Sequence, residues 1–146
     1  MNAQTPSGGQ PKITVAIPTY RREQVLIDTV GELLACDPPP AEILVLDQTP
    51  KHTPDAAAAL RDWDAAGHIR WLRLSEPSIP RAMNRGLLEA RHDLVLFLDD
   101  DIRSEPGLLQ AHLAAHRNTG AALIAGRVIQ PWQEGKDFSK DVGFHF

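Results

Sequence analysis

Three aspartates in a row, Asp99, Asp100 and Asp101, follow the apolar run LVLFL at residues 94–98. Neighbouring like charges repel one another, so three of them at the end of a buried strand do not stabilise the fold by themselves. Carboxylate oxygens are hard ligands that suit Mg²⁺ or Mn²⁺, and such an ion normally shares its coordination sphere with substrate phosphates. The run therefore predicts a divalent-metal site that takes a phosphorylated ligand. The alternative is a solvated strand end, with Asp100 or Asp101 capping the next helix.

Polar clusters also close three earlier apolar runs. They read PTYRR at 18–22, DQT at 47–49 and SEPSIPRAMN at 75–84. The carboxyl ends of parallel strands share one edge of a sheet, where α/β proteins bind their ligands, so we expect all four clusters at one rim. No GxGxxG or GxxxxGK loop follows the first run, which disfavours a dinucleotide or P-loop site. A bound metal is then the expected holder of the phosphates.

The elements that must position these clusters alternate between strand and helix patterns. Apolar runs predict five strands, at residues 13–17, 42–47, 69–74, 93–99 and 122–129. The third run alternates with polar residues, which is typical of an edge strand. Helical periodicity predicts helices at 22–35, 53–66 and 80–90, the second with Thr53 as N-cap and Pro54 in its first turn. A fourth helix is expected to open with Ser104 as N-cap and with Glu105 and Pro106 in its first turn.

Runs such as ILVL and LVLFL show no polar alternation, so their strands are expected to be buried on both faces. This pattern predicts an α/β fold, a mostly parallel sheet with helices on both faces. Trp63 and Trp71 are interpreted as side chains that pack a helix against this sheet. His112 and His116, four residues apart on the fourth predicted helix, are interpreted as surface or interface residues rather than metal ligands.

Composition fits one globular domain. The chain has 146 residues, of which 42% are apolar and 23% charged. Its net charge of -4 argues against a nucleic-acid partner, which would favour clustered Lys and Arg. The single Cys36 excludes an internal disulfide, and the chain shows neither a secretory signal nor an apolar run of roughly 18 residues, so a cytoplasmic location is expected. Residues 1–11 are predicted to be a disordered tail.

The motifs VAIPTYRR, a strand ending in Asp, PRAMNRGLLEA and LVLFLDDDIRSEPGLL occur in this order. Together they resemble the family 2 glycosyltransferases of the GT-A fold, across roughly residues 12–130. The resemblance implies a Rossmann-like GT-A sheet and an inverting transfer of a sugar from a nucleotide-diphosphate sugar, with a UDP-sugar favoured. The sugar would pass to a hydroxyl of a saccharide, lipid or other acceptor, with Mn²⁺ or Mg²⁺ held by the DXD element at 99–101.

The resemblance also assigns site residues. The loop after the first strand would line the nucleoside pocket, where Tyr20 could stack on the base. Asp47 would contact the base, commonly uracil in this family, and Gln48 follows where many members have a second acid. The implied nucleotide-sugar site consists of Pro18, Thr19, Tyr20, Arg22, Asp47, Gln48, Arg81, Asn84, Asp99 and Asp100. Asp99 and Asp101 are the implied metal ligands. Taken alone, Asp47 is equally typical of a turn residue that hydrogen-bonds locally after a strand.

Family members carry their general base well beyond the DXD element, so the resemblance implies a base beyond Phe146. Residues 12–146 are then expected to be the donor-binding part of a longer domain whose acceptor side follows. Any peripheral membrane association would come through those further parts, and no pattern marks an oligomer interface. Two alternatives remain open. One is a noncatalytic nucleotide-sugar-binding module, and the other is a metal-dependent nucleotidyltransferase, which usually has glycine in the loop after the first strand.

Overall fold

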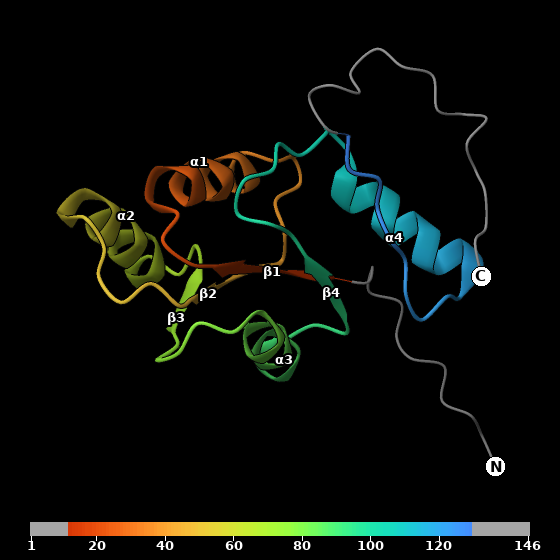
Figure 1. The fold of residues 1–146 in the computed structure, drawn as a ribbon. Helices are drawn as coiled ribbons and strands as arrows, with labels where there is room; N and C mark the ends of the chain where they lie inside the picture. Colours follow the sequence, from red (N-terminus) through yellow and green to blue (C-terminus); the bar gives the residue numbers. More distant parts are fainter. Residues whose placement is uncertain (1–11, 130–146) are drawn as a thin grey trace.

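The computed structural model describes residues 12–129, in which strands and helices alternate along the chain (Figure 1). The elements of this part are β1 (Ile13–Thr19), α1 (Glu23–Leu34), β2 (Glu42–Asp47), α2 (Pro54–Ala65), β3 (Arg70–Arg73), α3 (Ile79–Glu89), β4 (Leu94–Phe97) and α4 (Leu108–Thr119). The first three helices agree with the predicted ranges to within one residue at each end. Thr53 caps α2 as predicted, accepting a hydrogen bond from the Ala56 N–H. The tail predicted at residues 1–11 lies outside the described residues.

The four described strands form one parallel sheet in the order β3-β2-β1-β4. In this sheet Thr19 of β1 stands opposite Asp47 of β2, and Ala16 of β1 stands opposite Phe97 of β4. Strand β3 lies at an edge, as its alternation predicted. Helices α1 and α2 lie on one side of the sheet and α3 on the other (Figure 1). The prediction of a mostly parallel α/β sheet with helices on both faces is therefore confirmed.

Two apolar clusters hold the helices against the sheet. The larger one joins β1 and β2 to α1 and α2, and its buried members include Val15, Ile17, Leu26, Val30, Val45 and Leu60. Trp63 and Trp71 pack against this cluster, as predicted. The smaller one lies under α3 and consists of Ala16, Leu44, Leu46 and Ala82. Burying each large aliphatic side chain contributes roughly 1.5–3 kcal/mol, so the two clusters are the main source of the sheet's stability.

The predicted fifth strand at 122–129 is wrong. Within the described residues this segment has no strand geometry, and it runs beside α4 (Figure 1), where a Cβ on Gly126 would lie 3.3 Å from His112 Nε2. A strand forms only where a partner satisfies its backbone hydrogen bonds. In residues 12–129, β4 pairs with β1 alone, and Leu123 is 88% exposed. An apolar pattern without a pairing partner therefore did not produce a strand.

The ends of β4 and α4 also differ from prediction. β4 stops at Phe97 rather than residue 99, because the chain turns at residues 100–101 after the Leu98 N–H has bonded to the Ala16 carbonyl at 3.0 Å. Helix α4 begins at Leu108 with Gly107 as N-cap, not with Ser104. Gly107 has φ 88°, a left-handed conformation that interrupts a right-handed helix, so residues 104–106 remain in the loop.

None of the helices within residues 12–129 is long and apolar enough to span a bilayer.

Candidate functional site at the carboxyl ends of the strands

The four polar clusters meet at one rim of the sheet. The Gln48 N–H donates to the Thr19 carbonyl at 3.0 Å, which joins the ends of β1 and β2. The Leu74 N–H donates to the Asp47 carbonyl at 2.7 Å, which brings the end of β3 to the same place. The Thr19 hydroxyl donates to Asp100 Oδ2 at 2.6 Å, which adds the aspartate run after β4. The rim that the parallel strands predicted is therefore present.

The middle aspartate of the run points inward. Asp100 is 7% exposed, its Oδ2 accepts from Thr19, and its backbone carbonyl accepts from the Thr29 hydroxyl of α1 at 2.8 Å. Burial raises the pKa of this carboxyl; the Thr19 hydrogen bond and the Arg22 charge oppose the rise, and the flanking aspartates add to it. Asp100 thus links the turn at residues 100–101 to β1 through Thr19 and to α1 through Thr29.

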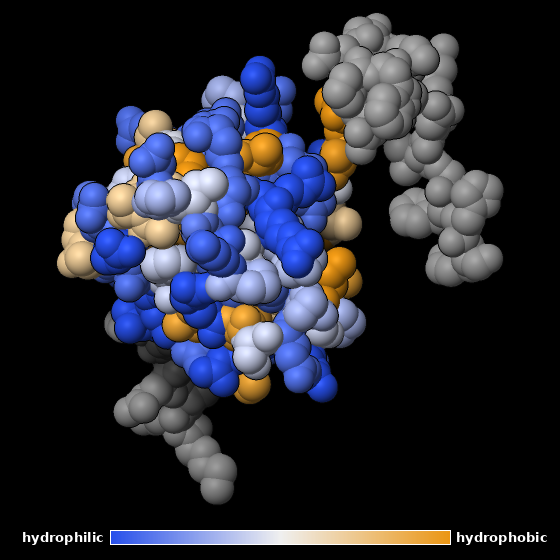
Figure 2. Space-filling view, turned by 60° about the vertical axis from the view of Figure 1, so that its left-hand side comes forward, coloured by the Kyte–Doolittle hydropathy of each residue, from blue (hydrophilic) through white to orange (hydrophobic). Residues whose placement is uncertain are grey.

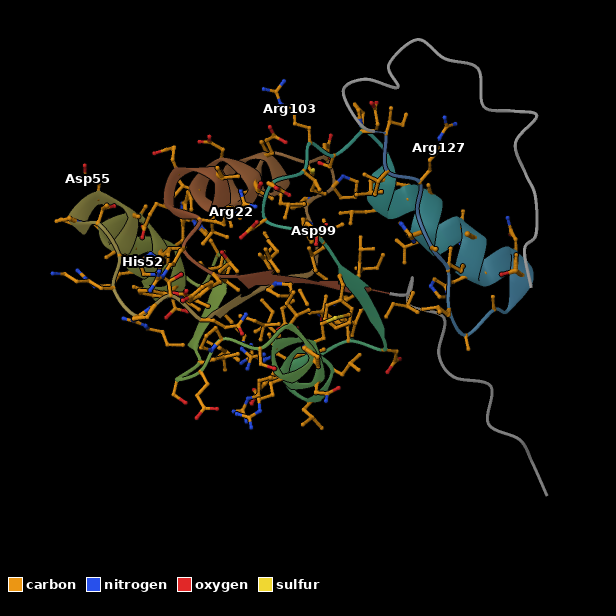
Figure 3. The ribbon with its side chains drawn as sticks, viewed as in Figure 1. Arg22, His52, Asp55, Asp99, Arg103 and Arg127 are labelled. Carbon is orange, nitrogen blue, oxygen red and sulfur yellow. The ribbon has the colours of Figure 1, made fainter. Side chains whose placement is uncertain are left out.

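The two flanking aspartates face the solvent. Asp99 and Asp101 are both exposed, and Figure 3 shows Asp99 beyond the end of β4. Asp101 Oδ2 lies 3.5 Å from Arg22 Nη2, and both side chains are about half exposed. Within residues 12–129, no three His, Cys, Asp or Glu side chains are arranged to hold a metal ion together. Two outward carboxylates with hard oxygens nevertheless suit Mg²⁺ or Mn²⁺ when phosphate oxygens and water complete the coordination sphere.

Asp47 is fully enclosed at the end of β2. Its side chain has no exposed surface, and both carboxylate oxygens accept hydrogen bonds. Oδ1 accepts from the Thr49 N–H at 2.8 Å, a local turn bond of the kind that aspartate commonly makes after a strand. Oδ2 lies 2.6 Å from His52 Nε2 and accepts from Trp71 Nε1 at 2.8 Å. In this conformation the carboxylate is satisfied from within the protein.

His52 links Asp47 to the start of α1. Its ring nitrogens lie 2.6 Å from Asp47 and 2.9 Å from Glu23, and its side chain is 2% exposed. Because a carboxylate only accepts hydrogen bonds, both nitrogens must carry protons to make both bonds. Burial would lower the pKa of His52, but the hydrogen bonds and charges of Asp47 and Glu23 outweigh burial and raise it. Sequence reasoning missed this histidine, because nothing in the spacing of the 50–53 loop distinguishes it from a surface residue.

The β1 and α3 loops supply the remaining predicted residues. Tyr20 is 39% exposed, and the Arg21 guanidinium lies over its ring, 5.1 Å from the centroid. Pro18, two residues earlier in β1, is half-buried. Arg21 has φ 56°, and its N–H donates to the Thr49 hydroxyl at 2.8 Å, so this left-handed residue connects the β1 loop to the β2 loop. Tyr20 is therefore partly exposed in a loop that is tied to the end of β2.

At the start of α3, the Ser78 N–H donates to Gln48 Oε1, and Ser78 is the N-cap of that helix. Gln48 is buried, with 4% of its surface exposed. Arg81 and Asn84 are exposed on α3, and Arg81 pairs with Glu76. No hydrogen bond or ion pair within residues 12–129 joins Arg81 or Asn84 to the aspartate run. The structure thus brings the β1, β2 and β4 residues into direct contact, and leaves these two at the margin.

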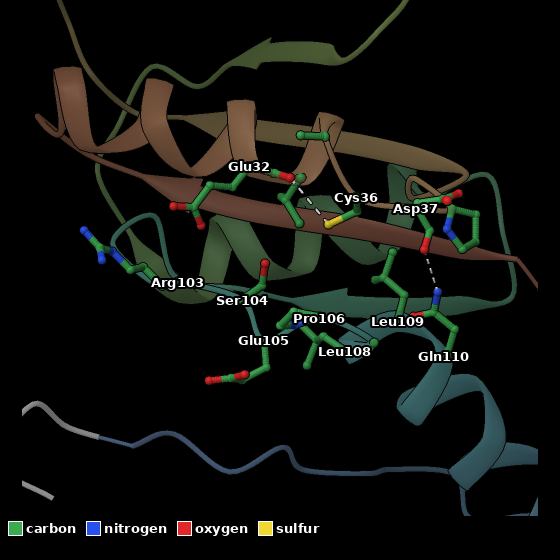
Figure 4. Close-up of a pocket in the computed structure, with 14 residues that line it drawn as sticks. Glu32, Cys36, Asp37, Arg103, Ser104, Glu105, Pro106, Leu108, Leu109 and Gln110 are labelled. Atoms are coloured by element: carbon green, nitrogen blue, oxygen red, sulfur yellow. Dashed lines mark hydrogen bonds between the residues drawn. The ribbon is translucent and has the colours of Figure 1, made fainter. Parts of the chain in front are cut away.

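The surface at the rim is mostly hydrophilic (Figure 2), and a hollow between α1 and the loop after β4 includes Asp101 in its lining. Figure 2 shows the side onto which β1, β2 and β3 end, where hydrophilic residues predominate and apolar ones form small separate patches. A cavity of about 520 Å³ lies between the end of α1 and the loop before α4 (Figure 4), lined by residues such as Glu32, Cys36, Arg103 and Leu109. None of the predicted site residues lines this cavity.

Known proteins are similar to this chain in sequence or in fold. A sequence profile described as Glycosyl transferase family 2 matches residues 14–142. The galactofuranosyltransferase GlfT2 of Mycobacterium tuberculosis is 31% identical over 144 residues, which cover 90% of this chain and 22% of that protein. The chain therefore spans less than a quarter of that relative's length.

Two solved structures share the fold at 23% identity. The first is TarS 1–349 of S. aureus in complex with UDP-GlcNAc, with a TM-score of 0.58 over 75% of this chain and 32% of that one. The second is the mannosyltransferase PcManGT of Pyrobaculum calidifontis in complex with GDP-Man and Mn²⁺, with a TM-score of 0.53 over 64% of this chain and 28% of that one. This likeness concerns the fold alone, and it confirms the expected GT-A architecture.

Proposed function

The chain belongs to glycosyl transferase family 2, and on this premise we propose that its described part is the nucleotide-sugar-binding part of a glycosyltransferase. The enzyme transfers a sugar from a nucleotide-diphosphate sugar to an acceptor hydroxyl, with inversion at the anomeric carbon. The observation that supports this proposal best is the arrangement of the aspartate run. Thr19 and Thr29 hold Asp100 inward, and Asp99 and Asp101 then face the solvent at the rim.

In this proposal Asp99 and Asp101 hold Mn²⁺ or Mg²⁺ at the rim. The ion, when bound, neutralises charge on the nucleoside-diphosphate leaving group. Arg22, already 3.5 Å from Asp101, keeps a guanidinium beside the same phosphates. Tyr20 offers its exposed ring to the base. The nucleotide-sugar site of the proposal comprises Pro18, Thr19, Tyr20, Arg22, Asp47, Gln48, Arg81, Asn84, Asp99 and Asp100.

The remaining details of the reaction are also part of the proposal. A UDP-sugar is the favoured donor, because the resemblance assigns uracil to the residues that close β2. The acceptor is a saccharide, a lipid or another hydroxyl compound. The general base that deprotonates the acceptor belongs to chain outside residues 12–129. The reaction takes place in the cytoplasm, in keeping with the free thiol of Cys36.

A donor-turnover assay tests this proposal. The protein, in a form that extends beyond Phe146, is incubated with UDP-, GDP- and dTDP-sugars and Mn²⁺. With water as the acceptor, released nucleoside diphosphate is measured alongside the anomeric proton of the released sugar by NMR. We expect release from one nucleotide class. Asp101→Ala should lower it by about 100-fold or more, equivalent to roughly 3 kcal/mol of lost transition-state stabilisation. Asp62→Ala, a matched exposed aspartate on α2, should leave release unchanged. Equal turnover in the two variants would contradict the proposal.

A further inference from the structure

We infer that His52 is a positioning residue for the nucleotide site, because in its protonated form it ties the loop after β2 to the start of α1 and thereby holds Arg22 at the rim. Nucleotide binding then depends on the proton that His52 carries. This inference rests on the proposed function, because it takes for granted that the diphosphate of a nucleotide meets Arg22. It concerns a buried residue that acts through its neighbours and does not itself contact the nucleotide.

Two contacts join the β1 loop to the loop after β2, and they stand on either side of Arg22 in the chain. Before it, the Arg21 N–H donates to the Thr49 hydroxyl at 2.8 Å. After it, Oε2 of Glu23, the first residue of α1, lies 2.9 Å from His52 Nδ1. The Arg22 side chain is itself about half exposed. The position of its backbone, and with it the reach of the guanidinium, therefore depends on these two contacts.

The contact between His52 and Glu23 needs a doubly protonated ring. His52 Nε2 lies 2.6 Å from Asp47 Oδ2, and the His52 side chain is 2% exposed, so water does not replace either partner. Both partners are carboxylates, which only accept hydrogen bonds. Burial lowers the pKa of His52, but the hydrogen bonds and charges of Asp47 and Glu23 outweigh burial and raise it.

The contact with Glu23 is the one that opens when the ring loses a proton. A neutral imidazole keeps a single N–H, so one of the two carboxylates then faces a lone pair. Asp47 is 0% exposed and is held by two further donors, whereas the Glu23 side chain is 29% exposed and can turn to water. The remaining proton therefore stays with Asp47. Only the longer bond from the Thr53 N–H to Glu23, at 3.4 Å, then ties the loop to α1.

The other groups around the ring do not replace this link. Trp71 of β3 packs edge-on against His52, with 5.8 Å between ring centroids, and does not titrate. Arg73 of the same strand is a cation, but its guanidinium donates to the backbone carbonyls of residues 49–50. Figure 3 shows Asp55 of α2 apart from the His52 ring. The two carboxylates that touch the ring therefore set its protonation.

The pH dependence of nucleotide affinity tests the inference. The wild-type chain is titrated calorimetrically with UDP, GDP and dTDP in the presence of Mg²⁺, at intervals between pH 6 and 9. For the nucleotide that binds, we expect the affinity to fall about three- to tenfold as the pH rises through the folded pKa of His52. A terminal phosphate loses its last proton near pH ~6, which strengthens binding as the pH rises, so the nucleotide itself cannot cause this fall.

Glu23→Gln is the discriminating variant. Its amide oxygen still accepts from His52 Nδ1, but the negative charge is gone, so the fall in affinity should move to lower pH. Glu32→Gln is the matched control. Glu32 is exposed on the same helix, and its carboxylate makes no hydrogen bond or ion pair within residues 12–129, so its profile should coincide with that of the wild type. His52→Gln has no proton to lose and should bind weakly at every pH.

A nucleotide that binds with the same affinity from pH 6 to 9 overturns the inference and leaves the proposed function standing. The inference is also overturned if the fall occurs at the same pH in Glu23→Gln and in Glu32→Gln. Should Glu23→Gln fail to fold, the wild-type profile and that of His52→Gln decide, because a fall of equal size in both would assign it to another group. If no nucleotide binds at any pH, the proposed function fails and the inference fails with it.

Discussion

Thr19 at the end of β1 donates a hydrogen bond to Asp100 Oδ2 at 2.6 Å, although the two residues are 81 positions apart in the chain. Both are buried. This bond fastens the aspartate turn after β4 to the central strand. It decides which of the three aspartates points inward, and so which two remain for a metal ion.

Thr19→Val removes this donor and keeps the shape of the side chain. The Asp100 carboxylate would then lose a buried partner, so we expect the free energy of unfolding to fall by about 1–3 kcal/mol in chemical denaturation. Thr119→Val removes an exposed hydroxyl at the end of α4, which donates to the Ala115 carbonyl and accepts from the Ala121 N–H. It should lower the free energy of unfolding by less than about 0.5 kcal/mol, because water can replace both partners. Equal effects of the two substitutions would show that the Thr19 bond does not fasten the turn.

The free energy of unfolding should fall as the pH becomes alkaline, because His52 then loses its proton. Its pKa is raised in the folded protein, so its contribution is fully present below the unfolded value of about 6.5 and is lost as pH rises through the folded value. Denaturation between pH 6 and 9 should show this decline in the wild type. His52→Gln should flatten it, whereas His68→Gln, on an exposed turn, should not. If His52→Gln shows a decline of the same size, the loss of stability comes from another titratable group.

Trp71→Phe tests the donor to Asp47. The change keeps an aromatic ring against the larger cluster but removes the N–H that lies 2.8 Å from Oδ2. We expect a loss of about 1–3 kcal/mol of unfolding free energy, measured by urea denaturation. Trp63→Phe, which changes a tryptophan in the same cluster without a bond to Asp47, supplies the control and should cost less. If Trp63→Phe lowers the free energy of unfolding as much as Trp71→Phe does, the hydrogen bond to Asp47 is not the source of the loss.

Gly86→Ala tests the close approach of α3 to the sheet. A Cβ at this position would lie 2.9 Å from Leu46 Cδ1 and 3.0 Å from Phe97 Cε1, so we expect overpacking to cost about 1–3 kcal/mol in thermal or chemical unfolding. A Cβ on Gly31 of α1 meets nothing within 4 Å, and Gly31→Ala should stabilise the protein by roughly 0.5–1 kcal/mol. If both substitutions stabilise the protein, α3 does not pack against the sheet as closely at Gly86 as described.

The sequence predicted the sheet better than it predicted contacts between loops. Uninterrupted apolar runs identified β1 and β2, and Thr53 and Pro54 marked the start of α2, because these signals are local. The fifth strand failed for the converse reason: residues 122–129 have a strand pattern, but a strand also needs a partner edge, which no local pattern encodes. The left-handed Gly107 likewise displaced the start of α4 from Ser104.

The candidate site was likewise predicted only in part: the sequence indicated the positions of its residues but not the directions of their side chains. Strand ends are predictable from apolar runs, so the sequence placed Thr19, Asp47 and the aspartate run at one rim. The direction in which each side chain points depends on partners from other elements. Asp100 turns inward because Thr19 and Thr29 meet it, and Asp47 is enclosed because His52 and Trp71 reach it. Neither set of contacts produces a residue spacing that could be recognised in the sequence.

The most direct measurement is a calorimetric titration of the chain with UDP, GDP and dTDP, each with and without Mn²⁺, in the wild type and in Asp101→Asn. Circular dichroism first confirms that both are folded. The proposed site predicts that one nucleotide binds, that its affinity rises at least about tenfold with Mn²⁺, and that Asp101→Asn removes this rise. Folded wild-type protein that binds none of the three, or that binds equally well without the metal, would contradict a metal-dependent nucleotide site at the aspartate run.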